Sequence, residues 1–265
     1  MLSTLSEKVD PKYSALILVD VQNDFCADGG AMHREGRDLT LVKEMIPRLE
    51  RLLEASRRAK VACIWIRCAY NTGPNHYLSE VWLEQAKRRR NGAYVSYPVC
   101  EPGEWNDDFF QVRPHPNEVI ITKHRYGAFE GTDLDLVLRS RGIRTVIMTG
   151  VATNVCVETT ARQAFLKDYY VVFTSDCSAT FSQAAQDATL YNIDHSSERS
   201  LPASRSWRAG LPPRRAYASP EPSLTDCRGD RPCMSVRWPP SHVSGRAAHG
   251  LDDVLIARAA AEVRR

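Results

Sequence analysis

Cys156 stands where a thiol could act as a nucleophile. It follows an apolar run at residues 145–149 and a turn at Gly150, and it precedes a segment with helical spacing at residues 158–166. A buried strand, a tight turn and a helix in this order put Cys156 in or near the first helical turn. Unpaired backbone N–H groups and the positive end of the helix dipole lie there, so we expect the thiol to ionise more readily than a free one. The pattern predicts a cysteine hydrolase.

Asp20 and Lys123 occupy the same topological position as Cys156. The short apolar runs 15–19 and 118–122 are typical of buried parallel strands, and each ends directly before one of these charged residues. Ligands of open α/β sheets bind outside the carboxyl ends of the strands, so the three side chains are expected to converge there. A carboxylate can take the thiol proton and return it to a leaving amine, and an ammonium group stabilises both anions.

Spacing alone leaves a structural alternative open. Buried cysteines commonly serve as packing residues, and aspartate and lysine side chains at strand ends often cap helices or pair with each other. Cys177 also follows a strand, but we interpret it as a packing residue, together with Cys26, Cys63 and Cys68.

The other predicted elements complete a doubly wound parallel sheet. Two further strands are expected at residues 61–66 and 170–174, and the alternation of strands and helices is typical of the α/β class. The long excursion at residues 71–116 is expected to form a lid or a pocket wall. The predicted helices span residues 39–59, 132–141, 158–167 and 183–193.

Composition indicates a globular protein outside the membrane. The 265 residues are 43% apolar and 25% charged, with no apolar run of the length, about 18 residues, that a transmembrane helix needs. Residues 1–11 lack the apolar core of a signal peptide, so we expect a cytoplasmic location. The eight cysteines form no CxxC pair, which favours reduced thiols over disulfides or structural zinc.

The character of the chain changes near His195. Residues 196–265 contain 12 Arg, no Lys and 7 acidic residues, together with 8 of the 15 prolines. Large aliphatic residues are too few there to bury a core, so we expect a hydrolase domain at residues 1–195 and a disordered Arg/Pro/Ser-rich tail at residues 196–265. The domain carries 23 basic and 25 acidic residues, so no nucleic-acid-binding body is expected.

Three ordered motifs resemble those of the isochorismatase-like cysteine hydrolase superfamily. They are residues 18–25 (LVDVQNDF), Lys123 with the following Arg125-Tyr126, and residues 150–158 (GVATNVCVE). The likeness covers about residues 13–195 and is strongest to the ureidoacrylate amidohydrolases of pyrimidine breakdown, and residues 138–144 (LRSRGIR) add to it.

The resemblance implies a Rossmann-like three-layer α/β/α fold with a mainly parallel sheet. It implies a catalytic triad of Asp20, Lys123 and Cys156. It also implies a cis peptide bond between Val151 and Ala152, so that the N–H groups of Ala152 and Cys156 together form an oxyanion hole.

The implied activity is that of an amidohydrolase that needs neither a metal nor a cofactor. The cysteine would cleave a C–N bond of a small ureido, carbamoyl or amide substrate through a thioester. Phe25 and Tyr126 match positions that line the substrate pocket, although both also fit as packing aromatics. Nicotinamidases of the superfamily hold a metal through an Asp-x-His pattern after the second strand. Here that region reads Arg67 to Asn71, with His76 alone, so we expect no metal and disfavour nicotinamide as the substrate.

Several alternatives stay open. The substrate could be an N-carbamoyl amino acid or biuret, or the chain could be a non-catalytic variant whose arginine-rich tail binds acidic partners. Relatives continue past the His195 position with a sixth strand and a final helix, whereas this sequence turns Arg/Pro/Ser-rich. We therefore expect the sixth edge strand to be missing, and our hypothesis is a reading-frame shift near codon 195. The expected partner is a small molecule, not nucleic acid or membrane, and a homo-oligomer is compatible with the sequence.

Overall fold

Six parallel strands form one sheet in the order β3-β2-β1-β4-β5-β6. The computed structural model describes residues 2–70, 77–89, 97–196 and 199–201. The strand order is that of the doubly wound fold, which confirms the expected fold class. The strands are β1 (Ser14–Val19), β2 (Ala62–Cys68), β3 (Val119–Lys123), β4 (Thr145–Val151), β5 (Tyr170–Ala179) and β6 (Arg199–Leu201).

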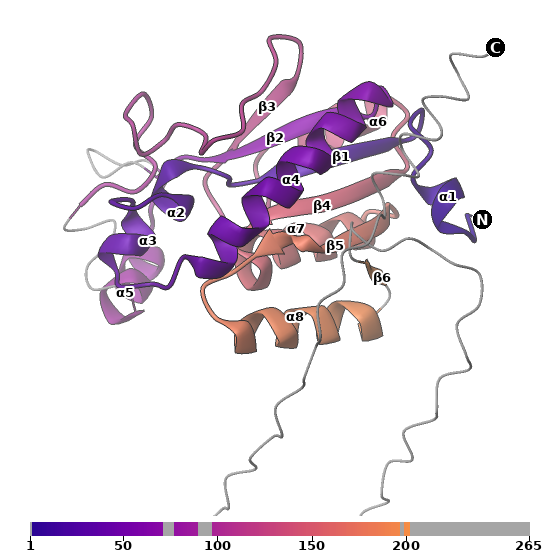
Figure 1. Cartoon of the computed structure of the whole chain (residues 1–265). Coiled ribbons are helices and arrows are strands. Elements are labelled where there is room, and N and C mark those ends of the chain that lie inside the picture. The colour runs from indigo at the N-terminus through magenta and orange to yellow at the C-terminus, as the bar shows by residue number, and fades with distance from the viewer. Residues whose placement is uncertain (1, 71–76, 90–96, 197–198, 202–265) are drawn as a thin grey trace, which may run out of the picture.

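Helices connect the strands and cover both faces of the sheet (Figure 1). The long helix α4 (Thr40–Arg58) lies close to its expected bounds and carries the connection from β1 to β2. The others are α1 (Leu5–Lys8), α2 (Asn23–Cys26), α3 (Ala31–Arg34), α5 (Glu80–Arg89), α6 (Leu134–Ser140), the π-helical segment η1 (Thr153–Val157), α7 (Glu158–Leu166) and α8 (Gln183–Ser196).

The packing of β1 explains why five of its six residues are apolar. Successive side chains of a strand point to opposite faces of the sheet. Leu16 and Leu18 share one buried cluster with residues of α4, whereas Ile17 and Val19 share the other with residues of α6 and α7. All six residues of β1 are buried, because helices cover both of its faces.

The expected loss of the sixth strand is wrong. Residues Arg199–Leu201 form β6, which pairs in parallel with Val172, Phe173 and Thr174 of β5. Nothing in the sequence signalled this strand, because a strand of three residues that pairs through its backbone needs no apolar pattern. The sheet therefore extends past the predicted boundary at residue 195. The predicted disorder of the tail concerns mainly residues 202–265, which lie outside the described residues.

The excursion between β2 and β3 lies beyond the carboxyl ends of the strands. Figure 1 shows α2, α3 and α5 gathered at this end of the sheet, and α1 near the amino ends. Two isolated antiparallel bridges attach the excursion to the segments that follow β1 and β2, one joining Gln22 to Phe109 and the other Tyr70 to Val99.

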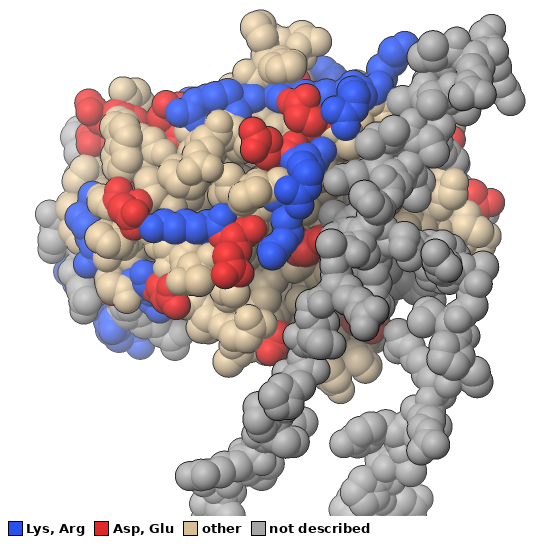
Figure 2. All heavy atoms as spheres, viewed as in Figure 1, with Lys and Arg blue, Asp and Glu red and all other residues tan. Residues whose placement is uncertain are grey.

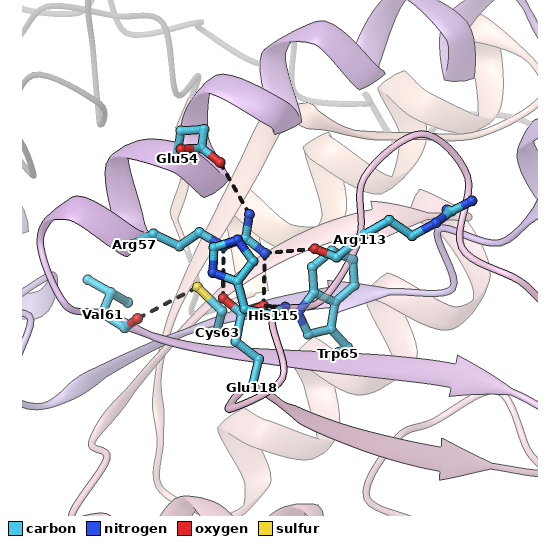
Figure 3. A network of polar contacts seen from close by, with 8 residues as sticks. All are labelled: Glu54, Arg57, Val61, Cys63, Trp65, Arg113, His115 and Glu118. Carbon is cyan, nitrogen blue, oxygen red and sulfur yellow. Dashed lines mark hydrogen bonds and ion pairs between the residues drawn. The ribbon is translucent and has the colours of Figure 1, made fainter.

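A cluster of polar contacts joins α4 to the segment that leads from the excursion into β3 (Figure 3). The Arg57 guanidinium donates two hydrogen bonds to the Glu118 carboxylate, at 2.8 and 2.9 Å, and a third to the Arg113 carbonyl. Glu118 also accepts hydrogen bonds from the Trp65 indole N–H and from the His115 backbone N–H. Burial alone would raise the pKa of Glu118, but these donors lower it below its ordinary value.

Charges of both signs are interspersed on the face that carries α4. Figure 2 shows lysine and arginine side chains lying among aspartate and glutamate side chains there. The exposed positions of α4 include Lys43, Glu44, Glu50, Arg51 and Glu54. Within the described residues, no helix is long and apolar enough to span a membrane.

Candidate active site

Asp20 lies at the carboxyl end of β1, in a backbone conformation that few residues adopt. Its φ is +50°, in the left-handed region, and its N–H donates to the Ile66 carbonyl of the neighbouring strand. Gln22 holds the turn that follows, because its side chain hydrogen-bonds the backbone of Cys68 and that of Asp107. The carboxylate of Asp20 is buried, with a side-chain exposure of 1%.

Lys123 reaches the same place from β3, on the other side of β2. As the last residue of β3 it pairs in register with Cys68. Its ammonium Nζ lies 2.8 Å from Oδ2 of Asp20 and donates to the Arg125 carbonyl at 3.0 Å. The side chain is wholly buried. A buried ammonium is stable only when paired, which the carboxylate and the carbonyl achieve here.

Cys156 completes the centre. Lys123 Nζ lies 3.5 Å from its Sγ and donates a hydrogen bond to it. Cys156 belongs to the π-helical segment η1, directly before α7, instead of the first turn of a regular α-helix. The three predicted catalytic residues therefore converge, with Lys123 in contact with both the carboxylate and the thiol.

The expectation of an easily ionised thiol is wrong for this state of the site. Burial raises the pKa of Cys156 well above its usual value; Lys123 opposes that rise, and the charge of Asp20 adds to it. Burial also raises the pKa of Asp20, against the attraction of Lys123. Burial alone would lower the pKa of Lys123, but the negative partners hold it well above its usual value. Lys123 therefore pairs with Asp20 beside a thiol whose neutral form is favoured, because desolvation of the thiol outweighs the helix-end effect.

The backbone between β4 and Cys156 has two unusual features. The peptide bond between Val151 and Ala152 is cis, as the family resemblance implied. Gly150 has a φ of +106°, and a Cβ at this position would collide with the backbone of Val19 on β1. Only glycine allows this close approach of the two strands at the edge where the site lies. Ala152 and Cys156 both face the adjoining cavity.

A cavity of about 520 Å³ opens beside the thiol. Both predicted pocket residues, Phe25 and Tyr126, line it. The Tyr126 ring packs against Trp82 at a centroid distance of 4.6 Å, and its hydroxyl lies 3.5 Å from the Gln85 side chain of α5. The excursion that carries α5 therefore forms part of the pocket wall, as expected.

Several polar residues of the site were missed by sequence reasoning. Arg37, Asn154 and Thr180 line the cavity, and the Thr180 hydroxyl donates to the Asn154 amide oxygen at 2.6 Å. Asp24 joins two loops, because its carboxylate accepts from the N–H groups of Ala31 and Cys100. The motif at residues 18–25 contained Asp24, but no periodic pattern signals such loop contacts.

Metal ligands do not gather in the part of the chain that the structure describes. There, no group of three or more His, Cys, Asp or Glu side chains is placed to hold an ion. His76 lies outside the described residues, so the expectation of a metal-free site stays a prediction.

The fold and the site together define a doubly wound α/β protein with a buried Asp-Lys-Cys centre. The isochorismatase domain matches residues 14–199, and the chain therefore belongs to the isochorismatase family. This confirms the resemblance drawn from the three sequence motifs.

Individual relatives agree with this membership. The chain is 33% identical over 195 residues to ureidoacrylate amidohydrolase RutB of Enterobacter sp. (strain 638), covering 69% of this chain and 83% of that protein. A cysteine hydrolase from Pseudomonas syringae pv. phaseolicola 1448A is 26% identical, with a TM-score of 0.62 over 74% of this chain and 91% of its own. Nicotinamidase/pyrazinamidase PncA from Bacillus subtilis, 22% identical, shares the fold with a TM-score of 0.59 over 71% and 99% of the two chains.

Proposed function

We propose that this protein is a cysteine amidohydrolase that cleaves a C–N bond of a small ureido, carbamoyl or amide substrate. The observation that carries the proposal is the position of Lys123, which contacts both the Asp20 carboxylate and the Cys156 thiol at the base of a cavity. The similarity to a ureidoacrylate amidohydrolase supports a substrate of the ureido type.

The first step is formation of the nucleophile. The thiol of Cys156 is neutral in the resting site, so it needs a base in contact range. Asp20, which is buried beside it and paired with Lys123, takes the proton. Lys123 then stabilises the thiolate, because its ammonium already donates to Sγ. The pKa of Asp20 lies above the usual carboxyl value, which makes it a stronger base than a solvated carboxylate.

The second step is acyl transfer. The thiolate attacks the carbonyl carbon, and the N–H groups of Ala152 and Cys156 hold the oxyanion of the tetrahedral intermediate. The intermediate collapses to a thioester as the C–N bond breaks, and Asp20 returns its proton to the departing amine or ammonia. Water, deprotonated by Asp20, then hydrolyses the thioester and restores the thiol. Phe25 and Tyr126 are proposed to pack against the substrate from the cavity wall.

An ammonia-release screen tests the proposal. The full chain is incubated with ureido, carbamoyl and carboxamide compounds, and intact-mass spectrometry after rapid acid quenching reports an acyl adduct on Cys156. We expect turnover with at least one compound and a loss of at least ~10³-fold in Cys156→Ala, because the nucleophile is removed.

Cys63→Ala is the matched control. This buried cysteine lies in the amino-terminal half of β2, away from the cavity, and its thiol contacts the Val61 carbonyl. The folded Cys63→Ala variant should retain activity. Undiminished turnover in Cys156→Ala would eliminate the mechanism.

A chelator tests the predicted independence from metal. Dialysis of the active protein against EDTA should leave the rate of ammonia release unchanged, because the proposed steps use only side chains and backbone N–H groups of the chain. Loss of activity on dialysis, restored by a divalent cation, would show that the prediction is wrong.

A further inference from the structure

We propose that Arg37 selects substrates that carry a carboxylate, by binding that carboxylate at the cavity wall while the scissile carbonyl faces Cys156. The inference rests on the proposed amidohydrolase function and narrows its substrate class to small ureido or amide acids. Arg37 lies on the segment between α3 and α4 and is one of the cavity-lining residues.

The charge around the cavity favours this role. Asp20 and Arg37 are the only charged side chains that line it among the described residues, and Asp20 is already paired with Lys123. The other polar residues of the lining are neutral: Tyr70, Gln85, Tyr126, Asn154, Thr159, Thr180 and Ser182. A substrate carboxylate that leaves water needs a positive partner. Arg37 is the one lining residue in the described part of the chain that supplies it.

Glu35 lies beside the Arg37 guanidinium without covering it. The Arg37 Nε lies 3.5 Å from Oε2 of Glu35, whose side chain is only 2% exposed. The Arg37 side chain is 46% exposed, so a ligand reaches the cation but not its anchoring carboxylate. Within the described residues this ion pair is the contact found for the guanidinium, and it leaves the two terminal nitrogens to donate elsewhere. Two parallel N–H groups of a held guanidinium match the geometry of a carboxylate.

The lining also suits the rest of such a substrate. Asn154 accepts a hydrogen bond from Thr180 through its amide oxygen, so its amide nitrogen remains available as a donor to a carbonyl. Phe25 and Phe181 provide apolar contact for a short carbon chain between the two polar ends. A ureido acid therefore finds a complementary group for each of its parts.

The test compares two substrates that differ only in charge. They are 3-ureidopropionate and 3-ureidopropanol, in which a hydroxymethyl group replaces the carboxylate. For Arg37→Met we expect kcat/KM for the acid to fall by about 10- to 100-fold, mainly through KM, because a charged hydrogen-bond partner is lost. The value for the alcohol should stay within about twofold of that of the unmodified protein. Arg37→Lys should retain part of the preference, since it keeps the charge and loses the planar fork.

Arg51→Met is the matched control. Arg51 is an exposed residue of α4 that does not line the cavity. Its replacement by Met changes the net charge of the protein by the same amount as Arg37→Met. It should leave both substrates unaffected. If Arg37→Met lowers kcat/KM equally for the acid and the alcohol, or lowers it for neither, the inference is overturned. Turnover of either compound would still support the proposed function.

A binding measurement separates failure of the inference from failure of the proposed function. Calorimetric titration of 3-ureidopropionate into Cys156→Ala, with and without Arg37→Met, reports the carboxylate contact in the absence of turnover. The dissociation constant should rise by about 10- to 100-fold when Arg37 is lost. If no compound is hydrolysed but this difference is found, the proposed reaction is wrong and the carboxylate site stands. Binding that is absent or independent of Arg37 overturns the inference.

Discussion

The ammonium of Lys123 lies 2.8 Å from the carboxylate of Asp20, although a complete strand, β2, separates β3 from β1 in the sheet. The length of the lysine side chain allows it to pass the end of β2 and reach the centre of the carboxyl edge. Both groups are almost completely buried, so each depends on the other for its charged form. The stability of the fold and the activity of the site should therefore both depend on this pair.

Breaking the ion pair from either side should destabilise the protein. Asp20→Asn leaves a buried ammonium without its counter-charge, and we expect a loss of about 3–5 kcal/mol in the free energy of unfolding. Lys123→Met should cost a similar amount, because the carboxylate is left unpaired. The double variant removes both charges, so its loss should be smaller than the sum of the single losses. Urea unfolding of the four proteins measures this coupling, and strict additivity would contradict it.

The pH dependence of activity should reflect Asp20. Because burial raises the pKa of Asp20 above its usual value of 3.8, the base becomes protonated at a higher pH than a solvated aspartate. We expect kcat/KM to be full above this raised pKa and to fall as the pH decreases through it. A profile from about pH 4 to pH 9 with the best substrate of the screen measures this limb. An activity that stays constant down to pH 4 would argue against Asp20 as the base.

Gly150 should tolerate no side chain. Gly150→Ala would force a Cβ against the Val19 backbone at a φ of +106°, and we expect a loss of roughly 2–4 kcal/mol in stability. Gly142 is the matched control, since its φ of +65° is also positive but a Cβ there meets nothing within 4 Å. Gly142→Ala should cost only about 1 kcal/mol. Thermal unfolding of both variants measures the difference, and equal losses would show that the close approach of Gly150 to Val19 is unimportant.

Glu118 should contribute stability that disappears in acid. Its pKa is lowered in the folded protein from the usual 4.5, so its contribution is present above that pH and is lost as the pH falls through the lowered value. Glu118→Gln should lose about 2 kcal/mol near neutral pH, because the Arg57 guanidinium loses its charged acceptor. Chemical unfolding at several pH values should show the difference from the unmodified protein shrinking toward acid. A difference independent of pH would contradict this role.

The sequence predicted most of the sheet because its strands are buried on both faces. Such strands appear as short apolar runs, and the five runs identified correspond to β1 to β5 within a few residues at most ends. The sixth strand escaped prediction, since Arg199–Leu201 pairs through its backbone and carries no apolar pattern. The same limit applied to Arg37, whose position in an irregular segment gave no sign that it faces the cavity.

The order of apolar runs and reactive residues along the chain was enough to predict five of the six strands and the α/β class, and it favoured the convergence of Asp20, Lys123 and Cys156. Those properties depend on local burial patterns and on the rule that parallel strands present their carboxyl ends at one edge. Only the tertiary structure decided the protonation of the site. The thiol of Cys156 is neutral at rest because packing removes water from it, and desolvation depends on atoms brought together from the whole chain.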